Sequence, residues 1–195
     1  MAIIIEKYSA QMLDPVVTLL ADAFVTNPLH ISAFGPEQIE RNRLFFRVGL
    51  REMFRGESLV AVADGEIHGY AHFSAAPHCL PAPEALPRAM LPLLKPLGTA
   101  SARLIQWFAR WCHLDPDRPH MHLGPIGVSL QAQRQGLGTA LMRCYLERLR
   151  REQLPGYLET DKSENVKFYE RFGFVVTHHE EVIGVPTWYM WRQKE

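Results

Sequence analysis

One stretch of this chain limits what it can fold into more than any other: a glycine-containing loop between a strand pattern and a helix pattern. Residues 122–128 are mostly apolar and are typical of a strand. After the loop, apolar side chains recur at the spacing of one face of an amphipathic helix, at Leu137, Ala140, Leu141, Cys144, Tyr145 and Leu149. The sequence therefore predicts a strand, a loop that holds Gly136 and Gly138, and a helix.

A loop in this position has the chemistry of an anion site. The first backbone N–H groups of a helix have no partner within the helix, and the helix dipole places partial positive charge there. Gly136 and Gly138 lack Cβ atoms, so a phosphate could approach the main chain, and Arg134 adds a cation. The same glycines also suit a plain strand-to-helix turn that needs small residues for packing, and glycine spacing alone leaves both interpretations open.

The spacing excludes two commoner phosphate loops and matches a third. A dinucleotide fingerprint needs a small residue three positions after Gly138, where Leu141 stands, and a Walker A loop needs Gly-Lys-Ser/Thr. The pattern Gln133-x-x-Gly136-x-Gly138 instead resembles the acyl-CoA loop of the GCN5-related N-acetyltransferases, the GNAT superfamily.

A second motif downstream resembles the same superfamily. Residues 157–160 are followed by Asn165 and then by residues 168–174, Phe-Tyr-Glu-Arg-Phe-Gly-Phe. This is similar to the strand, short helix and Gly-Phe of the second half of the GNAT core, and residues 158–174 resemble the branch that contains puromycin N-acetyltransferase. The resemblance covers about residues 120–191.

The resemblance implies an α/β fold with a mixed, mostly antiparallel central sheet that is flanked by helices. Its central strands would splay beside Val128, and acetyl-CoA would lie in the V-shaped opening. With 195 residues and 47% hydrophobic content, we expect a single acetyltransferase domain over residues 1–195. Six prolines within residues 77–96 predict an excursion over the cleft, built at most from short helices.

The activity implied by the resemblance is direct transfer of an acetyl group from acetyl-CoA to a primary amine of a small molecule or a peptide. The backbone N–H of Val128 would bind the thioester carbonyl. The cofactor-binding residues that the resemblance assigns lie on the strand, in the loop and on the later helix: Ile126, Gly127, Val128, Gln133, Arg134, Gln135, Gly136, Leu137, Gly138, Thr139 and Asn165.

The resemblance assigns Tyr169 as the acid that protonates the departing sulfur. Tyr169 lies four residues after Asn165, so both side chains project from one face of the predicted helix. Asn165 would contact the cofactor or orient its arm. The alternative is that Tyr169 only packs against Phe168 and Phe172.

The residues that could act as a base are His122 and Glu159. His122 lies six residues before Val128, where several family members have a Glu or His base, and an imidazole can accept a proton near neutral pH. His120 lies two residues earlier on the same strand face. Glu159 is on the following strand, and its side chain could face either way. Structural histidines and a water relay are the alternatives.

Two other functional classes remain open from the sequence. One is a non-catalytic acyl-CoA-binding regulatory module, which would keep the loop without turnover. The other is a zinc-binding protein, because one region holds plausible ligands, although their spacing matches no standard closed site and two of them are adjacent: Cys112, His113, Asp115, Asp117, His120 and His122. We therefore assign no metal-binding residue from the sequence.

Composition narrows the partners. Lys plus Arg and Asp plus Glu both total 21, so we expect no nucleic-acid partner. The sequence shows no apolar run of membrane-spanning length and no signal-peptide pattern, which predicts a soluble, cytoplasmic protein without a membrane partner. The odd number and wide spacing of Cys79, Cys112 and Cys144 argue against a disulfide framework. A homodimer is compatible with all of this.

Local signals predict the remaining elements. Ser9 and Ser163 are expected to cap helices, and Pro36 is expected in the first turn of another. Asp64-Gly65 predicts a hairpin turn. Strands are expected over residues 3–8, 58–63, 66–74, 175–183 and 187–191, the last two joined by a turn at 184–186, and a helix over residues 98–112. Aromatic residues in the N-terminal helices are expected to form core rather than an acceptor site: Phe24, His30, Phe34 and Phe46.

Overall fold

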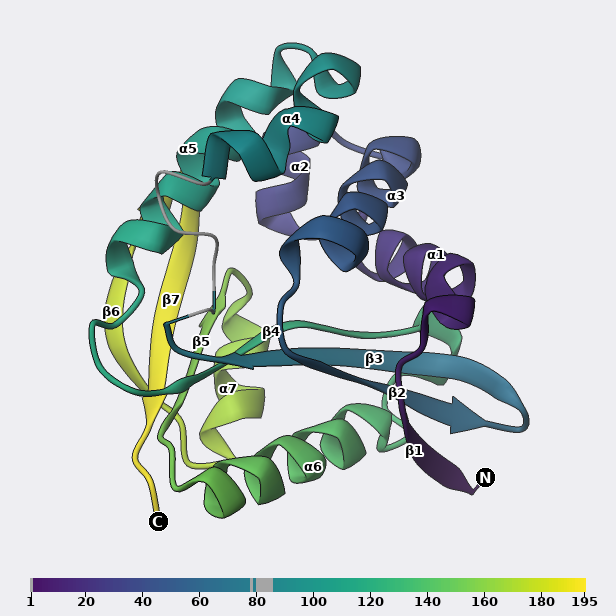
Figure 1. Cartoon of the computed structure of the whole chain (residues 1–195), viewed down its shortest axis with the longest axis vertical. Helices are drawn as coiled ribbons and strands as arrows, with labels where there is room; N and C mark the ends of the chain where they lie inside the picture. The colour runs from purple at the N-terminus through teal and green to yellow at the C-terminus, as the bar shows by residue number, and fades with distance from the viewer. Residues whose placement is uncertain (1, 78, 80–85) are drawn as a thin grey trace.

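The computed structural model of this chain describes residues 2–77, 79 and 86–195. It is a mixed α/β fold built on one seven-stranded sheet (Figure 1). The strands are β1 (Ile3–Lys7), β2 (Glu57–Ala63), β3 (Glu66–Ala75), β4 (Met121–Val128), β5 (Gly156–Thr160), β6 (Val175–Val182) and β7 (Val185–Arg192). Their order is β1-β2-β3-β4-β5-β7-β6, and every neighbouring pair is antiparallel except β4 and β5. The predicted fold class is confirmed.

The sheet separates two hydrophobic cores because side chains alternate between its faces. Val60, Tyr70 and Tyr157 point into one core. Leu158, on the same strand as Tyr157, points into the other core. Alternation along β4 likewise sends Met121 and the histidines beside it to opposite faces.

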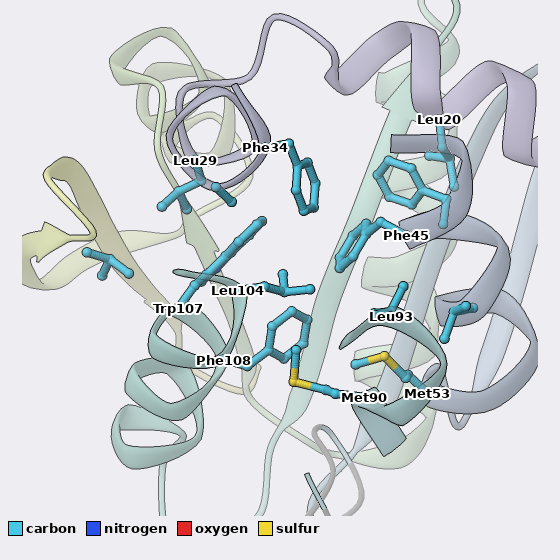
Figure 2. Close-up of a cluster of buried hydrophobic side chains, with 14 of the residues drawn as sticks. Leu20, Leu29, Phe34, Phe45, Met53, Met90, Leu93, Leu104, Trp107 and Phe108 are labelled. Carbon is cyan, nitrogen blue, oxygen red and sulfur yellow. The ribbon is translucent and has the colours of Figure 1, made fainter. Parts of the chain in front are cut away.

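Helices cover both faces (Figure 1). α1 (Leu13–Phe24), α2 (Pro28–Phe34), α3 (Ile39–Val48), α4 (Leu86–Leu97) and α5 (Ala100–Leu114) contribute to the first core. Figure 2 shows its centre, where Trp107 and Phe108 of α5 lie among side chains of the other helices. α6 (Leu137–Glu152) and α7 (Ser163–Glu170) cover the opposite face. A 3-10 turn (Ala10–Met12) precedes α1, a π-helical turn (Gly49–Met53) follows α3, and a 3-10 turn (Leu130–Ala132) follows β4.

In the described part of the chain, no single helix has the length and apolar composition needed to cross a membrane. One pair, Ala10–Phe24 with Pro28–Phe34, meets that test by length and composition alone, with a bend of 96° between the two helices.

Two predicted side-chain caps and one predicted helix start are wrong, and one real start was not predicted. Within the described residues, Ser9 and Ser163 make no side-chain cap bond, and the helix after Pro36 begins only at Ile39. Asn27 is the true side-chain cap, since its side chain accepts from the N–H of His30, and Pro28 occupies the first helical turn. The Asn-Pro pair therefore ends α1 and also starts α2.

The predicted turns hold more closely. β2 and β3 form the predicted hairpin, with Asp64 and Gly65 both at positive φ (51° and 82°). β6 and β7 also form a hairpin, but its turn lies one residue earlier than expected, at Ile183 and Gly184. Pro186 is consequently part of β7, opposite Glu181.

The proline-rich segment lies only partly within the described residues. Residues 78 and 80–85 fall outside them, so the predicted excursion over the cleft stays a prediction there. From residue 86 the segment is helical, with Pro92 and Pro96 inside α4. Met90, Leu93 and Leu97 are fully buried and join the first core.

Candidate active site

The central strands β4 and β5 separate soon after they meet. Their parallel pairing is limited to Met121 with Gly156 and His122 with Tyr157, although β4 continues to Val128 and β5 to Thr160. The two strands therefore diverge toward their carboxyl ends. This confirms the predicted splay and leaves one edge of β4 free of a strand partner in the described structure.

A cavity of about 1020 Å³ lies beside this free edge. It brings together β4, the glycine loop, the start of α6, the end of α1 and α7. Its lining contains most of the predicted cofactor-binding residues: Ile126, Gly127, Val128, Gln133, Arg134, Gly136, Leu137, Gly138, Thr139 and Asn165. Lys162 and Arg171 also line the cavity and add positive charge to that of Arg134. The volume and the lining suit a large anionic ligand.

The loop geometry fits close approach of an anion to the main chain. Gly136 precedes α6 with φ at +91°, a conformation that glycine adopts without strain. The N–H of Ala140 is the first to bond back to Gly136, so the preceding N–H groups at Leu137, Gly138 and Thr139 open the helix. A Cβ on Gly136 would meet nothing closer than 3.9 Å, so the requirement for glycine there is conformational.

The two glutamines of the loop brace it from within. The side-chain amide of Gln133 donates to the carbonyl of Val128 at 3.3 Å, and that of Gln135 donates to the carbonyl of Gln131 at 3.0 Å. Gln133 also lines the cavity, whereas Gln135 is absent from its lining. The side chain of Gln135 braces the loop, and its role in cofactor binding stays a prediction.

The backbone of Val128 faces the open edge of β4. The backbone N–H of Ser129 donates to the backbone carbonyl of His68 at 2.8 Å, which directs that N–H toward β3. In an extended strand, successive residues direct their N–H and C=O groups to opposite edges. The N–H groups of Val128 and Ile126 therefore point toward the cavity. On the other side, α1 approaches β4 so closely that a Cβ on Gly127 would lie 2.9 Å from Leu20 Cδ2.

Asn165 and Tyr169 lie on one face of α7, as predicted, and both line the cavity. Tyr169 is buried, with 6% of its surface exposed. Within the described residues its hydroxyl makes no hydrogen bond, unlike that of Tyr145, which donates to the carbonyl of Met121 at 2.6 Å. Burial, and then the charge of Asp161, raise the pKa of Tyr169, so it keeps its proton at neutral pH.

A smaller cavity of about 120 Å³ adjoins the first. The two share Phe24, Asn27, Ile126, Asn165 and Tyr169 in their linings. The smaller cavity is otherwise walled mainly by aromatic side chains of α3 and α5, by Phe54 after the π-helical turn, and by a polar end. The aromatic wall consists of Phe45, Phe46, Phe54, Trp107, Phe108 and Trp111, and the polar end consists of Cys79, His122, Glu159 and Asp161.

The N-terminal aromatic residues divide between core and cavity. Phe24, His30 and Phe46 line the smaller cavity, and Phe34 is buried core. His30 is itself a core residue: burial lowers its pKa to about 3, and its Nδ1 lies 2.6 Å from Asn42 Oδ1. The expectation of core is correct for Phe34, His30 and Phe46, which is 1% exposed, and Phe24 packs against the same core.

His122 and Glu159 meet at the polar end of the smaller cavity. His122 Nε2 lies 2.7 Å from Glu159 Oε2, and both side chains are buried. The pairing follows from alternation, since Glu159 lies on the same face of β5 as Tyr157, which pairs with His122. Burial by itself would lower the pKa of His122, but the Glu159 carboxylate and Cys79 raise it well above its usual value. His120, fully buried, does not line either cavity.

Asp161 was not predicted as a site residue. Its carboxylate accepts from Asn27 Nδ2 and from the backbone N–H of Leu29, both at 2.8 Å. These bonds tie the start of α2 to the end of β5 where the two cavities meet. The sequence carries no local signal for this contact, because Asn27 and Leu29 each lie more than 130 residues before Asp161 in the chain.

Comparison with known proteins agrees with this geometry. A family model described as the acetyltransferase (GNAT) family matches residues 25–174. A Corynebacterium glutamicum structure described as histone acetyltransferase HPA2 and related acetyltransferase is 22% identical, with a TM-score of 0.76 over 100% of this chain and 98% of that chain. A Drosophila melanogaster polyamine N-acetyltransferase is 14% identical, with a TM-score of 0.69 over 97% and 98%. The NatC complex bound to Gag peptide and CoA contains a chain that is 14% identical, with a TM-score of 0.58 over 100% of both chains.

This chain belongs to the GNAT acetyltransferase family. It is an N-acetyltransferase, and its acetyl donor is acetyl-CoA. The loop and the open edge of β4 fit that donor, because the unpaired N–H groups and the cations line a cavity of sufficient size.

Proposed function

We propose that this enzyme transfers the acetyl group directly to a primary amine of a small molecule or a peptide. The observation that carries the proposal is the junction of two cavities at Tyr169 and Asn165, with the glycine loop on one side and the His122–Glu159 pair on the other. Acetyl-CoA would occupy the larger cavity and the amine the smaller one. The Drosophila polyamine enzyme and the peptide-bound NatC complex act on or bind acceptors of these two kinds.

Each step of the transfer has a group in place. Acetyl-CoA supplies the acetyl group as a thioester. The Val128 N–H would donate to the carbonyl oxygen and stabilise the negative charge that develops there. The amine nitrogen forms the new bond to the carbonyl carbon while the carbon–sulfur bond breaks. Tyr169 would give its proton to the departing sulfur.

The proton lost by the amine would pass to the His122–Glu159 pair. The Glu159 carboxylate lines the smaller cavity, and one of its oxygens, Oε1, has no hydrogen-bond partner among the described residues. We assign Glu159 as the acceptor of the proton and His122 as the residue that orients it through Nε2. The aromatic wall of the cavity favours an amine with an apolar body.

The test begins with a thermal shift of the purified chain with acetyl-CoA, using acetate and adenosine as controls. A ligand at 100 times its Kd adds about 2.7 kcal/mol, which corresponds to a rise of several degrees for a chain of this size. Thiol release is then measured with a panel of primary amines, from polyamines to arylalkylamines and short peptides.

The thermal shift and the thiol-release assay together distinguish three outcomes. A rise in Tm with amine-dependent thiol release supports the proposal. A rise without release by any amine favours a non-catalytic acyl-CoA-binding module. No rise at millimolar acetyl-CoA contradicts the assignment of the larger cavity. The similarity to the branch of puromycin N-acetyltransferase stays a prediction. It is tested by including aminonucleosides in the panel of amines.

A further inference from the structure

A second cluster of reactive side chains lies at the inner end of the smaller cavity. Cys79 follows β3, Asp115 follows α5, His120 precedes β4, and His122 lies within it. One donor atom each from Cys79, Asp115 and His122 falls within 4.8 Å of the other two. His120 Nε2 lies 3.3 Å from Asp115 Oδ1 and 3.4 Å from Cys79 Sγ. Three potential metal ligands from three separate segments therefore surround one point, and His120 lies beside two of them.

The tautomer of His120 is fixed by its other ring nitrogen. His120 Nδ1 lies 2.8 Å from the carbonyl oxygen of Arg118, which can only accept, so Nδ1 carries a proton. In a neutral imidazole this leaves a lone pair on Nε2, directed at Asp115 and Cys79. A lone pair, a carboxylate oxygen and a sulfur then face one another in a buried space. Such an arrangement requires a cation among them, either additional protons or a metal ion.

His122 likewise has one ring nitrogen held by a partner and the other directed at Asp115. Its Nε2 is held by Glu159, whereas its Nδ1 has no hydrogen-bond partner among the described residues, although only 6% of His122 is exposed. Nδ1 points toward Asp115 Oδ1 at 3.9 Å, and that oxygen is also buried without a hydrogen bond in the described structure. A carboxylate on the remote nitrogen is the usual outer partner of a metal-binding histidine, because it fixes the tautomer and the ring orientation.

We propose that Cys79, Asp115 and His122 bind one zinc ion, with His120 beside it. Bonds of about 2.0–2.3 Å at tetrahedral angles place neighbouring donor atoms about 3.3–3.8 Å apart. Asp115 Oδ1 and His122 Nδ1 are 3.9 Å apart, and the donor atoms of all three residues lie within 4.8 Å of one another, so zinc binding would draw these side chains slightly closer together. One sulfur, one imidazole nitrogen and one carboxylate oxygen are donors that zinc accepts.

Zinc binding would displace protons from its ligands. The thiol of Cys79 donates to the carbonyl of Ser74 at 3.4 Å, and that proton leaves when the thiolate binds zinc. With three protein ligands, the site leaves one tetrahedral position for a water molecule. It would fasten the segment after β3 and the end of α5 to β4, and it would hold His122 with Nε2–H toward Glu159. The site is independent of the proposed acceptor.

The sequence indicated only part of this set. Asp115 and His122 are among the plausible ligands in the sequence, whereas Cys79 lies outside that region. Cys112, His113, Asp117 and His120 do not belong to the group that the described residues form. The essential sulfur comes instead from 36 residues before Asp115 in the sequence, a distance that the fold closes.

The test uses the full chain and the metal alone. Wild-type protein is incubated with a few equivalents of Zn²⁺, desalted and analysed for metal, and a parallel sample is loaded with Co²⁺ for absorption spectroscopy. We expect about one zinc per chain and a thiolate-to-cobalt charge-transfer band with tetrahedral d–d bands. Less than 0.1 zinc per chain, or a cobalt complex without the thiolate band, overturns the proposal.

Matched variants locate the ligands. Cys79→Ser should remove the charge-transfer band, and Cys144→Ser, which changes a cysteine on α6, should leave both the band and the stoichiometry unchanged. Glu159→Gln should keep the band but weaken zinc binding by about 10–100-fold, because it removes the carboxylate behind His122. Retention of the band in Cys79→Ser overturns the site. If Cys79→Ser does not fold, the wild-type stoichiometry and spectrum decide the matter alone.

Discussion

Replacement of Tyr169 by Phe separates a catalytic hydroxyl from a structural one. The Tyr169 hydroxyl makes no hydrogen bond within the described residues and lies where the two cavities meet. Its removal therefore leaves no internal partner unsatisfied, and the free energy of unfolding should change little. If the hydroxyl protonates the sulfur, its loss removes a contribution of about 10²–10⁴ in rate. A hundredfold loss corresponds to about 2.7 kcal/mol of barrier height.

Tyr145→Phe is the matched control. The Tyr145 hydroxyl is fully buried and donates to the Met121 carbonyl at 2.6 Å, but Tyr145 lines neither cavity. This variant should lose about 1–3 kcal/mol of stability, because it breaks the bond and leaves a buried carbonyl unsatisfied. A loss of about 2 kcal/mol lowers Tm by about 4–8 °C for a chain of this length.

The assay compares the two variants in three measurements. Single-turnover thiol release isolates the chemical step, calorimetry gives the Kd for acetyl-CoA, and thermal unfolding gives Tm. We expect Tyr169→Phe to lose at least a hundredfold in rate with Kd and Tm nearly unchanged, and Tyr145→Phe to show the reverse. A Tyr169→Phe enzyme with an unchanged rate refutes the acid role. An equal loss of rate in both variants refutes the reasoning that distinguishes them.

Three further substitutions examine the loop, a surface ion pair and the β5 packing. Gly136→Ala places a Cβ on a residue with φ at +91°, which costs about 1–2 kcal/mol in the loop conformation. The affinity for acetyl-CoA, measured by calorimetry, should therefore fall, and an unchanged Kd contradicts the assignment of the loop. The Arg110 guanidinium lowers the pKa of Glu180 to about 2, so the ionised carboxylate stabilises the fold at neutral pH and loses this effect as pH falls toward 2. Glu180→Gln should therefore lower Tm at pH 7. A Tm difference between the variant and wild type that is equally large at pH 2 argues against the ion pair. Gly156→Ala brings a Cβ within 2.9 Å of Leu149 Cδ1, so urea unfolding should show that the free energy of unfolding falls by about 1–3 kcal/mol. An unchanged free energy of unfolding would show that the neighbouring side chains move aside without cost.

Local patterns in the sequence carried much of the fold. The alternation of β2 and β3 and the Asp64-Gly65 turn depend on neighbouring residues alone, and both are present as expected. The same holds for the strand, loop and helix around Gly136, because the strand period, the glycine requirement and the helix period are all local. Capping was less predictable. Ser9 lost the role of cap because a 3-10 turn stands between it and α1, and that turn depends on packing.

The sequence by itself determined which residues could do chemistry, and the tertiary structure decided which of them meet. The positions of Asn165 and Tyr169 on one helix face follow from their spacing of four residues, but their place between two cavities follows from the divergence of β4 and β5. Glu159 could face either side until the register of β5 set it against His122. Asp161 and Cys79 gave no local signal at all, since their partners lie 36 to 134 residues away and only the closed sheet, with its helices packed on both faces, brings them together.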